Sequence, residues 1–165
     1  MSRLSFVVGG SEGIGSAVAQ RLASRGDDVV VMSRSEKKLA AASKRLDELR
    51  QKPGQTLVSR SIDITDAGET TRTIDGLVAV HGTPDVVVNT AGYARPGWLG
   101  EIPPEDVRGM VEVNLLGTIN LARAVAPHLQ AARGGTIVTT SSRPRRWPDW
   151  RECSVTPSTA RRSSG

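Results

Sequence analysis

Glycine residues cluster near the start of the chain, where residues 9–15 read Gly-Gly-Ser-Glu-Gly-Ile-Gly. A short apolar run ends at this cluster, and a segment with helical spacing begins within it. Because glycine has no Cβ, the backbone of such a turn can approach a phosphate group closely. The start of the following helix supplies free N–H groups and about half a positive charge. The pattern predicts a site for nucleotide phosphates, with an ordinary glycine-rich turn as the alternative.

Residues that bind metals or stack on nucleic-acid bases are sparse. The histidines His81 and His128 lie far apart with no third ligand in view, and Cys153 is the single cysteine. We therefore expect no metal site and no internal disulfide, and we expect a reducing, cytoplasmic setting. Aromatic residues make up only 3% of the chain, which argues against stacking platforms for single-stranded nucleic acid. The longest apolar stretches fall well short of the roughly 18 residues that suggest a membrane span.

The elements that must position the glycine cluster follow a regular alternation. Apolar runs predict five strands, at residues 4–9, 29–32, 56–62, 85–89 and 136–140, of which the first two are expected to be buried. Helical spacing predicts helices at residues 13–25, 35–51, 65–81 and 103–132, with Ser35 as the N-cap of the second. Alternation with short connections favours right-handed crossovers and a parallel sheet covered on both faces. We expect a doubly wound α/β fold of the Rossmann type, with strand order 3-2-1-4-5 and incomplete at its C-terminal end.

The last 23 residues differ in composition from the rest. Residues 143–165 hold six arginines and two acidic residues, whereas the chain as a whole has a net charge of +5. The excess positive charge therefore lies mainly in this segment. We expect one domain at residues 1–142, followed by an irregular, disordered basic tail. A phosphate-binding role for the tail is a weaker alternative, and we expect no specific nucleic-acid partner.

Four motifs in the same order resemble those of the short-chain dehydrogenase/reductase family. Residues 9–15 resemble its TGxxxGxG signature, with Val8 in the place of the usual threonine. Asn-Thr-Ala-Gly at residues 89–92 resembles its NNAG motif, and residues 113–117 resemble its helix-four asparagine motif. Ser142 follows the last apolar run as the catalytic serine of the family does. The resemblance covers about residues 3–142, and within it the wording around residues 92–129 is similar to bacterial 3-oxosphinganine-reductase-like members.

The resemblance implies an oxidoreductase that transfers hydride between a nicotinamide cofactor and a small carbonyl or alcohol substrate. It implies that the cofactor is held by Gly9, Ser11, Gly13, Ile14, Gly15, Arg34, Asp63, Asn89, Ala91 and Gly92. It gives Asn114 a water-holding role in a proton relay, and Ser142 a hydrogen bond to the substrate carbonyl. It also implies a homo-oligomer paired through the long helix at residues 103–132.

Each of these polar residues also has a purely structural interpretation. Asn114 lies within an apolar stripe that includes Val107, Val111, Leu121 and Val125, so it is expected in the core, where its amide requires a partner or a water. Asp63 could instead be a neighbour of a helix N-cap, and Asn89 could be a strand-end turn residue. Ser142 could be an ordinary loop serine.

Cofactor choice depends on the end of the second predicted strand. An acidic side chain there would accept the ribose 2′-hydroxyl and select NAD. The chain has Ser33-Arg34 instead, and a guanidinium can pair with a 2′-phosphate. We predict that NADP(H) is preferred over NAD(H), with Arg34 as the phosphate ligand; a solvated arginine at a helix start is the alternative. Glu12 opposes this preference unless its carboxylate points away.

The family's proton transfer needs a tyrosine, with a lysine four residues later that lowers its pKa. The only tyrosine here is Tyr93, and no lysine follows Ser142. Two classes therefore stay open: an NADP-dependent oxidoreductase, and a catalytically inactive nucleotide-binding fragment.

Codons allowed for residues 158–165, read one nucleotide earlier, can spell Tyr-Ser-Ala-Ser-Lys-Phe-Gly. We hypothesise that residues from about 143 are a frame-shifted readout of a longer dehydrogenase, which would leave the strand at 136–140 as an exposed sheet edge.

Overall fold

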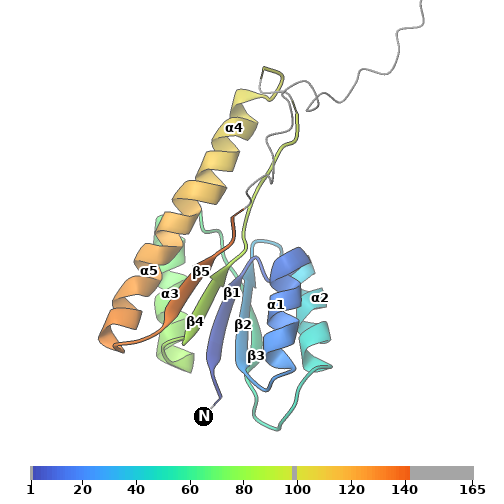
Figure 1. The fold of residues 1–165 in the computed structure, drawn as a ribbon, viewed down its shortest axis with the longest axis vertical. Coiled ribbons are helices and arrows are strands. Elements are labelled where there is room, and N and C mark those ends of the chain that lie inside the picture. The colour runs from blue at the N-terminus through green and yellow to red at the C-terminus, as the bar shows by residue number, and fades with distance from the viewer. Residues whose placement is uncertain (1, 98–99, 142–165) are drawn as a thin grey trace, which may run out of the picture.

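The computed structural model describes residues 2–97 and 100–141, which form one parallel sheet with helices on both faces (Figure 1). The strands are β1 (Leu4–Val8), β2 (Asp28–Ser33), β3 (Leu57–Ser61), β4 (Val86–Asn89) and β5 (Thr136–Thr139). Their order is β3-β2-β1-β4-β5, and every pairing is parallel. The predicted Rossmann-type α/β fold and strand order are therefore confirmed. The tail at residues 143–165 and the domain boundary before it lie outside the described residues, as does Ser142.

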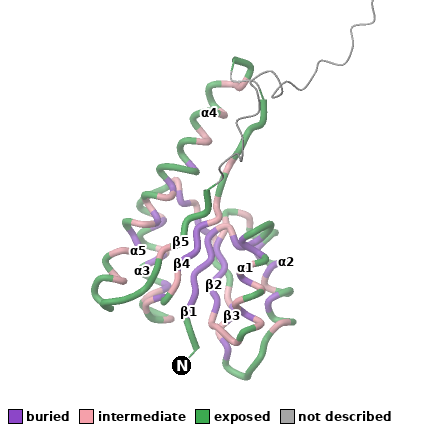
Figure 2. Tube along the Cα trace, in the orientation of Figure 1, coloured by how far each residue is buried: buried purple, intermediate pink, exposed green. Residues whose placement is uncertain are grey.

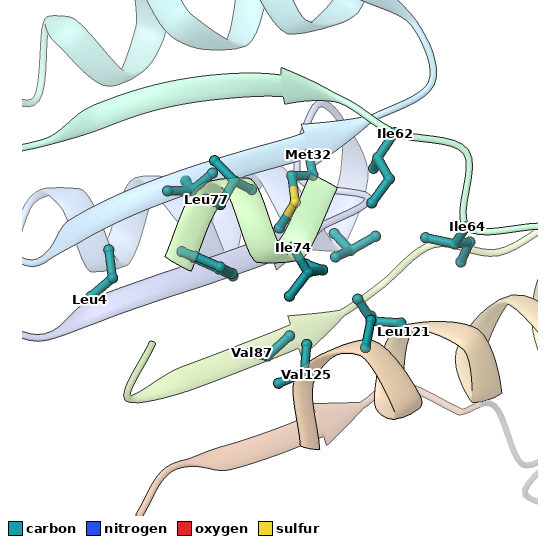
Figure 3. Packing of buried hydrophobic residues seen from close by; sticks show 13 residues of the cluster. Leu4, Met32, Ile62, Ile64, Ile74, Leu77, Val87, Leu121 and Val125 are labelled. Atoms are coloured by element: carbon teal, nitrogen blue, oxygen red, sulfur yellow. The ribbon is translucent and has the colours of Figure 1, made fainter. Parts of the chain in front are cut away.

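The helices are α1 (Gly13–Ala23), α2 (Glu36–Asp47), α3 (Ala67–His81), α4 (Pro104–Val111) and α5 (Thr118–Ala131). A π-helical segment, Glu112–Gly117, joins α4 to α5. Side chains of α1 and α2 pack against one face of the sheet, and those of α3 and α5 pack against the other. Figure 3 shows the second of these layers, where Ile74 of α3 and Leu121 and Val125 of α5 meet Val87 of β4. No helix among the described residues combines the length and the apolar character that crossing a bilayer requires.

The central strand determines where the carboxyl ends of its neighbours lie. In β1, Phe6, Val7 and Val8 are buried because both neighbouring strands and both helical layers cover them. Val8 pairs in register with Met32 of β2 and with Asn89 of β4. The loops that leave β1, β2 and β4 therefore start at the same edge of the sheet, where open parallel α/β sheets bind their ligands.

The helical stretch expected at residues 103–132 is present over residues 104–131, but it differs from the expectation in two respects. The π-helical segment interrupts it, and the wider turn shifts the phase of the side chains that follow. Leu121 and Val125 are buried as expected, whereas Val107 and Val111 of the expected core stripe are exposed. The reason is that α4 extends past the carboxyl ends of the strands, where no sheet lies beneath it (Figures 1 and 2). Of the two helices α4 and α5, only α5 packs on the sheet.

Strand β5 forms an edge of the sheet within the described part of the chain, as expected. Ile137 packs against the α3–α5 layer, whereas Val138, which points to the opposite face, is 43% exposed. The backbone on the outer side of β5 has no strand partner among residues 2–97 and 100–141.

Candidate functional site

A cleft of about 380 Å³ opens at the carboxyl ends of β1, β2 and β4. It is lined by every residue that was expected to hold a cofactor except Asn89. The lining also includes Glu12, Ser33 and Thr90, and it includes Lys38, which the sequence analysis did not single out. Ile14 lies at this cleft with its side chain 69% exposed, so the turn presents an apolar group as well as backbone. The predicted site residues, although spread over more than 80 positions of the sequence, are thus brought together.

The glycines of the turn serve two different purposes. At Gly9 the backbone has a φ of +77°, and a Cβ would lie 2.6 Å from the amide nitrogen of Ala91. At Gly15 a Cβ would overlap the hydroxyl of Thr90, which itself donates to the carbonyl of Val8 at 2.8 Å. These two glycines therefore let the turn pack against the loop that follows β4. At Gly13 the φ is +55° and a Cβ would meet nothing within 4 Å, so this side of the turn faces open space.

The N-terminus of α1 is free to bind an anion. Glu12 occupies the N-cap position, but its side chain makes no capping hydrogen bond. By contrast, Ser35 caps α2, as predicted, and Asp66 caps α3. Among residues 2–97 and 100–141, no side chain caps the first N–H groups of α1, and the positive end of the helix dipole adds to their attraction for an anion. Arg45 of α2 holds the turn from behind, because its guanidinium donates to the Ser11 carbonyl at 3.0 Å.

The end of β2 presents hydrogen-bond donors and cations to the cleft. Arg34 is 61% exposed, and its nearest carboxylate is that of Asp63 at 3.9 Å, a loose contact. The hydroxyl of Ser33 is buried and has no hydrogen-bond partner within the described part of the chain. Lys38, in the first turn of α2, also lines this wall. A buried donor without a partner is costly, so this wall of the cleft fits a ligand that offers acceptor atoms.

Asp63 has a local structural role as well as a place in the cleft. Its carboxylate accepts hydrogen bonds from the backbone N–H and the hydroxyl of Thr65, at 3.0 and 2.8 Å. These bonds stabilise the turn between β3 and α3. The Asp63 carboxylate therefore stabilises this turn and also lies, partly exposed, beside Arg34.

Asn89 is 3% exposed and lies behind the cleft wall. Its side chain accepts from the Ala91 N–H at 3.1 Å and donates to the Thr118 hydroxyl at 3.0 Å. These bonds match the strand-end turn that was its alternative interpretation, and they join that turn to the start of α5. Asn89 can contribute to ligand binding by positioning Ala91.

Asn114 is not in the core, contrary to the expectation from the apolar stripe. It lies in the exposed π-helical segment, where its side chain accepts from the Tyr93 N–H at 2.9 Å and donates to the Tyr93 carbonyl at 2.8 Å. Both hydrogen-bonding groups of the amide are thus satisfied by one backbone position. The pair forms a clamp that holds the loop after β4 against the helical segment, next to Gly92 of the cleft. A water-holding role for Asn114 stays a prediction.

Tyr93 extends this attachment but does not line the cleft. Its hydroxyl donates to Asp106 of α4, and Arg95 lies 3.6 Å from the same carboxylate. The hydrogen bond to Asp106 raises the pKa of Tyr93, and desolvation and the negative charge of Asp106 act in the same direction, while Arg95 lowers it. A phenol held in its neutral form serves as a structural donor. The Tyr93 side chain thus links the loop after β4 to α4.

Residues 3–148 match the family model described as short chain dehydrogenase. The chain belongs to this family. It is 31% identical over 140 residues to an uncharacterized oxidoreductase of Staphylococcus saprophyticus, covering 85% of this chain and 58% of that protein. It is 34% identical over 132 residues to a 3-dehydrosphinganine reductase of Arabidopsis thaliana, covering 80% of this chain and 38% of that protein. The family resemblance suggested by the motifs is confirmed, and the relatives include a 3-dehydrosphinganine reductase.

Solved short chain dehydrogenases share the fold. An actinorhodin polyketide ketoreductase determined with NADPH aligns with a TM-score of 0.78 and 31% identity, over 86% of this chain and 53% of that one. The present chain therefore spans about half the length of the family members it matches.

Metal ligands do not gather anywhere in residues 2–97 and 100–141, since no three His, Cys, Asp or Glu side chains lie close enough to share an ion. His128 is not simply solvated. Its Nε2 lies 2.7 Å from the Asp75 carboxylate, which links α5 to α3 on the outside of the helical layer.

Proposed function

We propose that this chain binds NADP(H) in the cleft and that the reaction it serves is hydride transfer between the nicotinamide and a small carbonyl or alcohol substrate. The observation that carries the proposal is the end of β2, where Ser33, Arg34 and Lys38 offer donors and cations to the cleft. A carboxylate at this position would select NAD. The ketoreductase that shares this fold was determined with NADPH, which supports the same cofactor class.

The residues present fit the dinucleotide in two places. The uncapped first turn of α1 suits the pyrophosphate, because backbone N–H groups and the helix dipole both favour an anion there. The guanidinium of Arg34 suits the 2′-phosphate, which it can bind through two parallel hydrogen bonds. When bound, the cofactor supplies or accepts the hydride.

The protein's own groups would then bind and orient. The Asn114 clamp holds the loop that carries Gly92, and the buried Asn89 holds the Ala91 backbone. By the resemblance, Ser142 donates a hydrogen bond to the substrate carbonyl, and Asn114 holds a water for the proton relay.

A second function is favoured by a separate observation. Tyr93 is the only tyrosine in the sequence, and it lies outside the cleft lining with its hydroxyl bound to Asp106. Residues 1–165 therefore include no tyrosine at the cleft that could serve the family's proton transfer. The alternative is a nucleotide-binding chain without turnover.

Titration of the purified chain with NADPH and NADH, followed by nucleotide fluorescence, tests the cofactor proposal. We expect tighter binding of NADPH, and we expect Arg34→Gln to weaken NADPH binding by about tenfold while changing NADH binding by less than about twofold. Arg25→Gln, which removes the same charge away from the cleft, serves as the control. Tighter binding of NADH would overturn the proposal. Turnover of a ketone panel with NADPH would favour the oxidoreductase, and binding without turnover would favour the second function.

We also propose a cytoplasmic location, no specific nucleic-acid partner, and a homo-oligomer paired through the helical stretch 103–132. The single cysteine in the chain supports the first, and the low aromatic content supports the second. Leu115, Leu116 and Ile119 are exposed on that stretch and support the third. Sedimentation equilibrium of the chain and of a Leu116→Glu variant tests the pairing. We expect the parent chain to sediment as an oligomer and the variant to associate more weakly.

A further inference from the structure

An ion pair crosses one wall of the cleft. Glu12, in the glycine-rich turn, binds the ammonium group of Lys38 of α2 at 2.7 Å. Both side chains line the cleft, and both are about half exposed. The two residues stand 26 positions apart in the sequence, and the contact joins the phosphate-binding turn to the end of β2 that carries Arg34.

Among the residues that the structure describes, the charges on the cleft lining balance when no ligand is bound. Its cations are Arg34 and Lys38, and its carboxylates are Glu12 and Asp63. Each cation has one carboxylate within 4 Å, at 3.9 Å for Arg34 and 2.7 Å for Lys38. A ligand phosphate with nearly two negative charges therefore meets a neutral wall unless the cations turn from their carboxylates. Both pairs are exposed enough for such exchange to cost little.

Glu12 gives Lys38 its importance. The carboxylate stands at the N-cap position of α1, beside the N–H groups that suit a pyrophosphate. Unneutralised, it would repel every phosphate of the ligand, and most strongly the most anionic ligand. Lys38 is the cation that cancels this charge.

We propose that Lys38 is a second determinant of the preference for a 2′-phosphorylated nucleotide, acting with Arg34 and set against Glu12. This inference rests on the proposed function. In the free protein Lys38 neutralises Glu12, and in the complex its ammonium group moves toward the added phosphate. Glu12 and Lys38 together form a charge pair that tunes how strongly the cleft distinguishes NADPH from NADH.

The test is a double-mutant cycle in the full chain. Dissociation constants for NADPH, NADH, 2′,5′-ADP and 5′-AMP are measured for the parent, Lys38→Gln, Glu12→Gln and the double variant. Lys37→Gln is the matched control. It removes the same charge at the neighbouring position, where the side chain is exposed and does not line the cleft. Lys38→Arg tests rescue by a conserved charge. Far-UV circular dichroism melts confirm that each variant folds.

We expect Lys38→Gln to weaken binding of the two 2′-phosphorylated ligands by about tenfold and of NADH and 5′-AMP by less than about threefold. Glu12→Gln should tighten NADPH binding, and the double variant should lie between the two single variants. Lys37→Gln should change nothing, and Lys38→Arg should keep the preference. Equal weakening of all four ligands by Lys38→Gln would show that Lys38 does not distinguish the 2′-phosphate and would overturn the inference, as would no effect.

The proposed function and this inference can fail separately. If Arg34→Gln discriminates between NADPH and NADH but Lys38→Gln does not, only the role of Lys38 is lost. If the parent chain binds NADH as tightly as NADPH, or binds neither, both are lost.

Discussion

Gly9→Ala is expected to destabilise the protein more than a glycine substitution that causes the same backbone strain alone. The new Cβ would lie 2.6 Å from the Ala91 nitrogen and 2.7 Å from the Thr90 carbonyl carbon, both backbone atoms. Ordinary contact begins near 3.4 Å, so the loop after β4 must move away. Left-handed strain costs about 1–2 kcal/mol, and overpacking adds about 1–3 kcal/mol. We expect a total loss of about 2–5 kcal/mol.

Gly54→Ala is the matched control. Gly54 has a φ of +81°, close to the +77° of Gly9, and a Cβ there would meet nothing within 4 Å. It should therefore show the strain alone, about 1–2 kcal/mol. Urea unfolding followed by far-UV circular dichroism measures both free energies. Displacement of the loop should also weaken NADPH binding in Gly9→Ala and leave it unchanged in Gly54→Ala. Equal destabilisation by the two substitutions would refute the packing that we assign to Gly9.

The attachment of the loop after β4 gives two further predictions. Asn114→Ala removes two hydrogen bonds to the Tyr93 backbone; it should lower the free energy of unfolding in urea by about 1–2 kcal/mol and weaken NADPH binding. Asn120→Ala, which loses bonds to the Ile64 and Thr65 carbonyls, should leave NADPH affinity unchanged. Equal loss of affinity in both variants would argue against the clamp. Because Tyr93 is the only tyrosine, its absorbance titration is unambiguous and should give a pKa above the usual value, which Asp106→Asn should lower. A raised pKa in the folded state means that this bond stabilises the protein below about pH 10 and is lost as the pH rises through the folded pKa, so Tyr93→Phe should flatten the alkaline loss of stability; a normal pKa in the parent would contradict the hydrogen bond.

The strands were predictable because of where they lie. A strand covered on both faces of a parallel sheet must be apolar throughout, which made β1, β2 and β4 the clearest runs in the sequence. The more exposed β3 and β5 were also matched to within one residue at each end. The turn at residues 9–15 was predictable for a similar reason, because few tight backbone conformations connect a central buried strand to the helix that follows it. The purposes of its glycines were not, because the neighbours of Gly9 and Gly15 come from residues 90 and 91.

The stretch 103–132 shows what an apolar pattern leaves open. The spacing identified apolar side chains, but it could not tell that the sheet ends beneath α5 and that α4 continues past it. Val111 is therefore 46% exposed although it repeats at helical spacing with Leu121 and Val125. The π-helical segment depends on backbone hydrogen bonds that no residue type signals, and it places Asn114 beside Tyr93 rather than in the core.

Long-range polar contacts were the other part that local reasoning missed. The Glu12–Lys38 pair and the Arg45–Ser11 bond both join α2 to the glycine-rich turn. A sequence pattern marks a charged helix face only as solvated. The one local signal was the conflict between Glu12 and an anionic ligand, for which the sequence suggested only a carboxylate that points away and not a partner cation.

The central claim is that a dinucleotide lies across the first turn of α1 and the end of β2. Amide chemical shifts of the isotopically labelled chain, recorded during titration with NADPH, test it directly. The account predicts that the largest changes fall on residues 13–15 and on Arg34, with smaller changes at Gly92. Saturable changes confined to other parts of the chain, or none at all at these amides, would contradict it.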